Sequence, residues 1–194
     1  AGIIGGALSV VEKAVTAGAA VDARNQQAET ALMMAASRRN REAVELLLGA
    51  GAAPDLRDRE GRSALLRAAE AGEVTVVERL CGAGAEVNLT DDEGATALLI
   101  ASRSGHTGVV ETLLEAGADP TERDNSQETP AVAAARAGQL DIVRLFDKRG
   151  VSLDARARLG HGMGSGTRPP PSSTIWTRAT VMLSLPPRSL ARSM

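Results

Sequence analysis

Short apolar segments with the spacing of an α-helix alternate with polar, turn-rich segments along the chain. After Ser63, apolar residues fall two, five and six positions further on, which predicts a first helix of about eight residues. Val76, Val77 and Leu80 have the spacing of a second helix. The next segment, 88–94, is short and polar and predicts a hairpin-like finger. The sequence thus predicts a unit made of two short helices and a finger.

This unit recurs at a step of 33 residues. Segment 96–101 (Thr-Ala-Leu-Leu-Ile-Ala) matches 63–68 (Ser-Ala-Leu-Leu-Arg-Ala), and 30–35 and 129–134 follow the same pattern. Two columns of glycine keep the same step: Gly72, Gly105 and Gly138 in one, and Gly18, Gly51, Gly84, Gly117 and Gly150 in the other. Several columns in register indicate an array of internal repeats.

A single unit of this kind cannot bury its apolar side. Helices of eight to ten residues are shorter than the roughly 12–15 residues at which isolated helices become marginal. Stacked neighbours bury a continuous core, and a column of alanines would let successive layers approach closely. That column holds Ala35, Ala68, Ala101 and Ala134. We therefore expect an all-α repeat solenoid.

The unit of finger, helix, turn and helix resembles the ankyrin repeat. The resemblance implies helix-turn-helix units with β-hairpin-like fingers and a non-catalytic role in protein–protein interaction, as a scaffold or adaptor. We place full repeats at 22–54, 55–87, 88–120 and 121–153, after a partial repeat at 1–21. The array is expected to span 1–160.

The sequence departs from the family pattern in two ways. The column that holds His in the family holds other residues here: Met33, Leu66, Leu99 and Val132. Ala28 and Gln127 replace the finger glycine, and Arg39 replaces the glycine between the helices. We therefore expect less regular fingers in the first and fourth full repeats.

The repeat pattern ends near residue 160. Asp147 takes an apolar position of the second helix, as in a capping repeat that meets water, and a broken finger is expected at 154–160. Residues 161–194 are predicted to be a disordered C-terminal tail. Residues 1–154 carry a formal charge of −8, whereas 155–194 carry six Arg and no acid. A non-native end and a basic arm that binds an acidic surface both remain open.

Composition excludes several classes of protein. Aromatic residues make up 1% of the chain, which leaves almost no platform for stacking bases or sugars. One Cys and two His supply neither an intrachain disulfide nor a zinc cluster. No stretch approaches the roughly 18 apolar residues of a membrane span. The chain begins at Ala1 without a signal peptide, and we expect it to be a fragment.

No set of residues assembles an active site. The Gly-rich run 160–166 lacks the Gly-Lys-Ser/Thr ending of a phosphate loop. His106 falls in the turn between helices, where packing is the simpler role, and Cys81 replaces an apolar residue. The acids at 91–93 are expected to be a solvated finger. We predict no catalytic residue, no metal, no cofactor and no small-molecule substrate.

The resemblance places the partner-binding surface on the finger tips and the exposed side of the first helices, which together form a concave face. The candidates carried over by column are Arg24, Gln27, Met34, Arg38, Arg57, Arg59, Glu60, Arg62, Arg67, Glu70, Asp92, Glu93, Ile100, Arg103, Arg123 and Arg136. The second repeat is rich in Arg and the third finger is acidic. We therefore expect a protein partner with acidic groups over the second repeat and a basic group over the third.

Two other functions stay open. The chain could be a regulatory or targeting part of a larger enzyme, channel or ubiquitin-ligase adaptor. Nucleic-acid binding through the basic tail is a weaker alternative. For the array itself we expect a monomer in the cytoplasm or nucleus.

Overall fold

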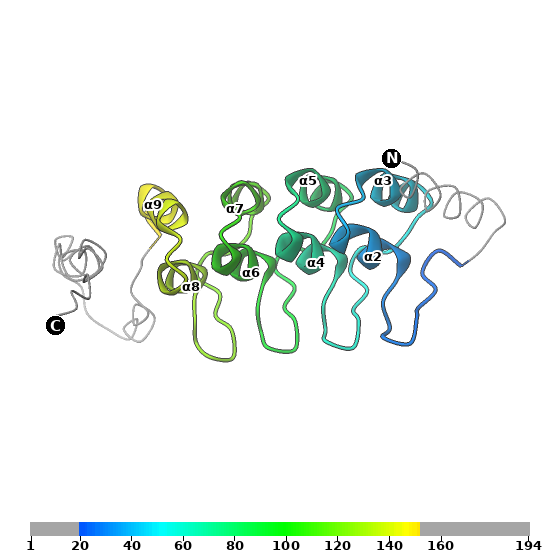
Figure 1. The fold of residues 1–194 in the computed structure, drawn as a ribbon, viewed down its shortest axis with the longest axis horizontal. Coiled ribbons are helices and arrows are strands. Elements are labelled where there is room, and N and C mark those ends of the chain that lie inside the picture. Colours follow the sequence, from blue (N-terminus) through cyan, green and yellow to red (C-terminus); the bar gives the residue numbers. More distant parts are fainter. Residues whose placement is uncertain (1–19, 152–194) are drawn as a thin grey trace, which may run out of the picture. The chain divides into compact units, whose positions relative to one another are not determined.

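The computed structural model describes residues 20–151, which form eight helices in four pairs (Figure 1). The pairs are α2 (Ala31–Ser37) with α3 (Arg41–Gly49), α4 (Ala64–Ala71) with α5 (Val74–Gly82), α6 (Ala97–Ser104) with α7 (Thr107–Glu115), and α8 (Pro130–Arg136) with α9 (Leu140–Lys148). Most of the partial repeat 1–21, the broken finger 154–160 and the tail 161–194 lie outside the described residues, so the predictions made for them stay predictions.

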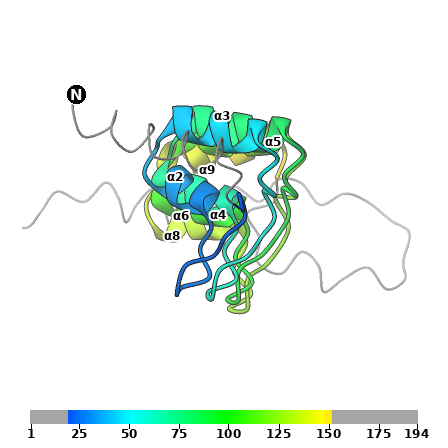
Figure 2. The same cartoon turned by 90° about the vertical axis from the view of Figure 1, so that its right-hand side faces the viewer.

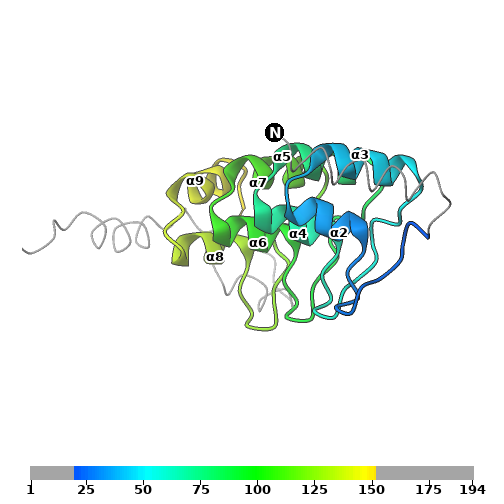
Figure 3. The same ribbon diagram turned by 45° about the vertical axis from the view of Figure 1, so that its right-hand side comes forward.

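The helices form two layers, with the fingers projecting on one side. The first helices of the pairs pack against one another in chain order, and so do the second helices (Figure 2). Figure 3 shows the four fingers extending from the layer of first helices, away from the second. No strand forms in residues 20–151, where Thr90 and Thr96 make one isolated bridge. The prediction of an all-α repeat solenoid is confirmed.

The core lies between the two layers and is filled with small aliphatic side chains. Leu65 and Leu98 of the first helices and Val77 and Val110 of the second are almost completely buried. The alanine column is buried as well, and Ala101 has no exposed surface. Small side chains in this column let neighbouring helix pairs approach closely.

Most of the first helices begin with a hydroxyl cap. The Oγ1 atoms of Thr30, Thr96 and Thr129 accept hydrogen bonds from backbone N–H groups three residues further on. Ser63 has the same extended backbone, but its buried hydroxyl makes no hydrogen bond. Helix α4 therefore begins after Ser63, where the sequence predicts it, but without a hydrogen bond from the cap hydroxyl.

Left-handed residues end the first helices of the second and third full repeats. Gly72 and Gly105 have φ angles of 77° and 84°. A Cβ atom at Gly72 would lie 2.5 Å from the ring of His106, so the turn has no room for a side chain. The His106 ring is held by its Nε2 atom, which lies 3.1 Å from the carbonyl oxygen of Glu70. His106 thus packs between repeats, as predicted.

All four fingers have the same backbone hydrogen bond at their base. The N–H groups of Asn25, Asp58, Asp91 and Asp124 each donate to the carbonyl four residues further on, at 3.0–3.1 Å. Ala28 and Gln127 take the left-handed conformation of the glycine they replace, with φ angles of 61° and 64°. The prediction of less regular fingers in the first and fourth repeats is wrong, because the hydrogen bonds impose one geometry on every finger.

Replacing Gln127 by Gly should stabilise the array. A residue with a Cβ atom in the left-handed conformation costs the folded state roughly 1–2 kcal/mol, and glycine removes this strain. Part of the gain is cancelled because glycine also makes the unfolded chain more flexible, which favours unfolding. We expect a gain of about 0.5–1 kcal/mol, measured by urea denaturation. Ala137→Gly is the control. Ala137 has a φ angle of −80°, which is unstrained for alanine, so glycine at this position should destabilise the protein. Equal shifts in the two variants would contradict the expectation.

The described part of the chain contains no helix that is long and apolar enough to cross a bilayer. Asp147 of α9 is exposed, as expected for a residue on a face that meets water.

Candidate functional site

The finger tips and the exposed positions of the first helices form one surface, called here the finger face. Each tip is bound to the next by a backbone hydrogen bond. The N–H groups of Arg59, Asp92 and Asn125 donate to the carbonyls of Gln27, Glu60 and Glu93, at 2.9–3.1 Å. These bonds fix four fingers relative to one another, so the tips present their side chains from a single rigid framework.

A column of carboxyl or amide side chains holds each finger in shape. Asp58 Oδ1 accepts from the N–H groups of Glu60 and Arg62, both at 2.9 Å. Asn25 and Asp91 accept two N–H groups in the same way, and Asp124 accepts the N–H of Glu128. Asp58, Asp91 and Asp124 stand 33 residues apart, so the sequence marks this column, but the spacing alone does not show which groups the carboxylates bind.

Arg67 is bound to the carboxylate of the second finger. Its Nε and Nη2 atoms both donate to Asp58 Oδ2, and Glu29 and Glu60 approach Nη2 at 3.5 and 3.6 Å. Burial alone would raise the pKa of Asp58, but the N–H of Arg62 and the Arg67 guanidinium outweigh it and lower this pKa. Arg67 therefore stabilises its own finger, and the nearby carboxylates already compensate its positive charge, so it is poorly placed to bind a partner.

Three more arginines of the finger face form contacts within the array. Arg62 lies 3.1 Å from a Glu70 oxygen and 3.4 Å from a Glu60 oxygen. Arg24 donates to the carbonyl of Arg57 at 3.1 Å, and Arg57 donates to the carbonyl of Thr90 in the next repeat at 2.7 Å. Arg57 also lies 3.5 Å from the Asp92 carboxylate. The contacts of Arg24 and Arg57 join neighbouring repeats, whereas those of Arg62 lie within the second repeat.

Ile100 does not belong to the exposed surface, and its prediction as a partner-binding residue is wrong. Only 5% of it is exposed, in a small cluster with Leu66 and Leu99 on the finger side of the first helices. Met34, at the same column in the first full repeat, is half-buried. The apolar part of the predicted site thus lies mostly inside the array.

Five of the predicted residues are exposed and make no side-chain hydrogen bond or ion pair within residues 20–151. They are Gln27, Arg38, Arg59, Glu93 and Arg103. Arg136 contacts Glu128 at 3.0 Å, and Arg123 donates to the carbonyl of Gln127. The finger face is therefore a framework of satisfied ion pairs from which a few charged side chains extend freely into solvent.

The described residues offer no cluster of acids, His and Cys that could hold a metal ion. Asp91 is turned into its finger, whereas Asp92 and Glu93 face solvent, so the three acids do not converge. Cys81 is half-buried against the core, and burial raises the pKa of its thiol. A raised pKa disfavours the thiolate that nucleophilic chemistry requires.

Comparison with known proteins agrees with the helix pairs and fingers described above. The family model of ankyrin repeats, which describes three copies, matches residues 2–91 and 76–157. No curated protein sequence matches the chain significantly. Ankyrin repeats generally mediate protein–protein interaction, and the family is typically non-catalytic. Because the matched residues cover most of its length, the chain belongs to the ankyrin-repeat family.

Proposed function

We propose that this chain is a protein-interaction module that binds a protein partner through its finger face. The observation that carries the proposal is the row of backbone hydrogen bonds between successive finger tips. These bonds fix the finger tips in the free protein. Partner binding therefore costs less conformational entropy than it would if the fingers became ordered only in the complex. They use backbone atoms alone, so the exposed side chains of Arg59 and Glu93 stay available for contact.

The free side chains indicate what kind of partner segment fits. Arg59 on the second finger would pair with a carboxylate, and Glu93 on the third finger would pair with a cation. Arg103 adds a second guanidinium on the helix behind the third finger. We still expect an acidic group of the partner over the Arg-rich second repeat. Among the arginines of that repeat, Arg59 would contact it, because Arg62 and Arg67 are paired within the array.

Replacing Arg59 and Arg103 together by Ala should weaken partner binding at least about tenfold, since two exposed charged contacts of 1 kcal/mol or more would be lost. A photo-crosslinking residue at position 59 would first capture the partner, and calorimetry on the purified pair would give the affinity. Glu111→Ala is the matched control, because Glu111 is an exposed charge on α7, away from the fingers, and has no ion-pair partner among the residues that the structure describes. The proposal would be refuted if the partner crosslinked from position 111 instead of position 59. It would also be refuted if the Arg59 and Arg103 double variant bound the partner as tightly as the unaltered chain does.

A further inference from the structure

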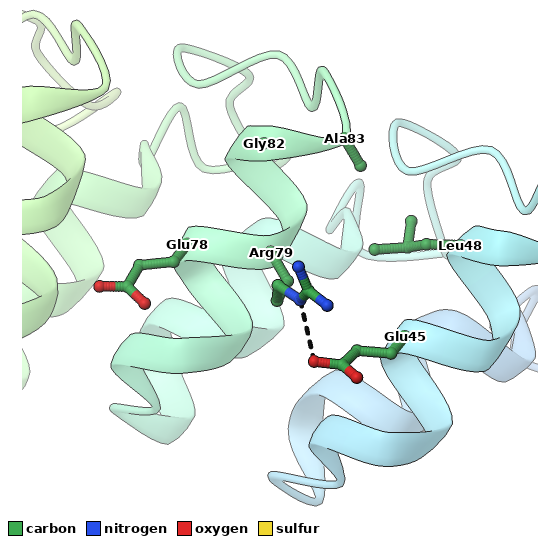
Figure 4. Close-up of a pocket in the computed structure, with 6 residues that line it drawn as sticks. All are labelled: Glu45, Leu48, Glu78, Arg79, Gly82 and Ala83. Carbon is green, nitrogen blue, oxygen red and sulfur yellow. Dashed lines mark hydrogen bonds and ion pairs between the residues drawn. The ribbon is translucent and has the colours of Figure 1, made fainter.

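A second surface with binding features lies on the other side of the molecule. Figures 1 and 2 show α3, α5, α7 and α9 forming the layer away from the fingers, here called the outer layer. Between α3 and α5 this layer has an open hollow of about 300 Å³. The hollow is lined by Glu45 and Leu48 of α3, by Glu78, Arg79 and Gly82 of α5, and by Ala83, the C-cap residue of α5 (Figure 4).

The hollow exists because α5 ends in residues with little or no side chain. One repeat later Glu115 stands at the column of Gly82, and Lys148 stands there in the last repeat. Between α7 and α9 the long side chains meet, with Arg149 lying 3.7 Å from a Glu115 oxygen. A Cβ atom built at Gly82 meets nothing within 4 Å. The interval between α3 and α5 therefore lacks the long side chains that meet between α7 and α9.

Apolar groups face each other across the hollow, and an ion pair closes one end. Figure 4 shows Leu48 of α3 and Ala83, which follows α5, pointing toward one another. Glu45 Oε1 accepts hydrogen bonds from Arg41 at 3.0 Å and from Arg79 at 2.9 Å. Both arginines are thus held by one carboxylate and are not available to bind an anion.

The charges around the hollow favour a cation. Helices α3, α5 and α7 carry five glutamates and two arginines, and both arginines contact Glu45. Glu78 extends from α5 on the side away from α3 and has no partner among the residues that the structure describes. Glu42 and Glu111 are likewise exposed and unpaired within 20–151. A segment that crosses this surface would meet negative charge on both sides of the hollow.

We propose that the hollow between α3 and α5 is a second docking site, which takes a basic segment of a partner protein. The segment inserts an aliphatic side chain between Leu48 and Ala83 and places a Lys or Arg beside Glu78. The volume is at the lower end of the roughly 300–1,000 Å³ of small-molecule pockets, and the hollow is open to solvent. It therefore fits one or two side chains of a larger ligand. This site is separate from the finger face and does not depend on the function proposed for it.

A library of 12-residue peptides, selected on the full chain and then compared on variants, tests the proposal. Gly82→Gln fills the hollow with a neutral side chain, and the helical backbone accepts it. Gly49→Gln is the matched control, because Gly49 holds the same column in α3, has open space around it and does not line the hollow. A second pair is Glu78→Gln, with Glu93→Gln as its control, because Glu93 is exposed on the third finger, away from the outer layer.

We expect a class of peptides that combines Lys or Arg with Leu, Ile or Met. These peptides should lose at least about tenfold in affinity on Gly82→Gln and should bind less tightly to Glu78→Gln, whereas both controls and Arg59→Ala bind as the unaltered chain does. Because Arg59 belongs to the finger face, unchanged binding of these peptides to the Arg59→Ala variant would show that they do not bind there. The proposal is overturned if no such class is selected, if the peptides that Gly82→Gln weakens are acidic, or if Gly82→Gln and Gly49→Gln behave alike.

Discussion

Replacing Ala101 by Asp should disrupt the array in its middle. Ala101 has no exposed surface and lies in α6, which packs against both α4 and α8. An aspartate there would place an unpaired carboxylate between layers, where burial of an unpartnered charge costs several kcal/mol. Because each repeat is stabilised mainly by its neighbours, the loss weakens two interfaces at once. We expect about 3–5 kcal/mol of destabilisation, measured as a lower urea midpoint.

Ser104→Asp is the control for that variant. It adds the same charge to the same helix, but Ser104 is exposed at the last turn of α6. An acid near a helix C-terminus costs roughly 0.3–1 kcal/mol, well below the cost expected at Ala101. A second, earlier unfolding transition in Ala101→Asp would show that the array has split into two parts. If both variants unfold at the same urea concentration, the packing described for α6 is wrong.

The features that the sequence predicted well are those that local rules determine and that the repeat reproduces. A Thr or Ser before a first helix and a Gly after it act within a few residues, and each recurs at a step of 33. The buried alanine column follows from the same register. Helix pairs, turns and core positions could therefore be deduced without any knowledge of the fold.

The candidate site was harder to predict. The position of a residue within the 33-residue repeat determines where it lies in the fold, but it does not determine which side chains it contacts. Arg67 and Ile100 share one column, yet Arg67 pairs with acids and Ile100 is covered by neighbouring apolar groups. The partners of Arg67 include Glu29 of the preceding repeat, so the pairing depends on how two repeats stack. Gln127 likewise adopts a glycine conformation because hydrogen bonds across the finger require it.

Replacing Asp58 by Ala should loosen the second finger and the ion pairs around it. The Asp58 side chain is 1% exposed, and its oxygens accept two backbone N–H groups and the Arg67 guanidinium. Alanine would leave those donors without an acceptor, and a half-buried arginine would lose its closest counter-charge. We expect a loss of about 2–4 kcal/mol in the free energy of unfolding, together with faster amide exchange at Glu60 and Arg62.

Asp58→Asn separates the hydrogen bonds of this side chain from its charge. Asn25 shows that an amide at this column can accept the two finger N–H groups, so the variant should lose mainly the ion pair with Arg67. The folded state lowers the pKa of Asp58, so the stability that its charge contributes is fully present above the usual pKa. It is lost as the pH falls through the folded value, and the advantage of the unaltered chain over Asp58→Asn should shrink below about pH 4. Denaturation of both proteins between about pH 6 and pH 2.5 measures this difference, and a constant gap across that range would show that the Asp58 charge does not stabilise the finger.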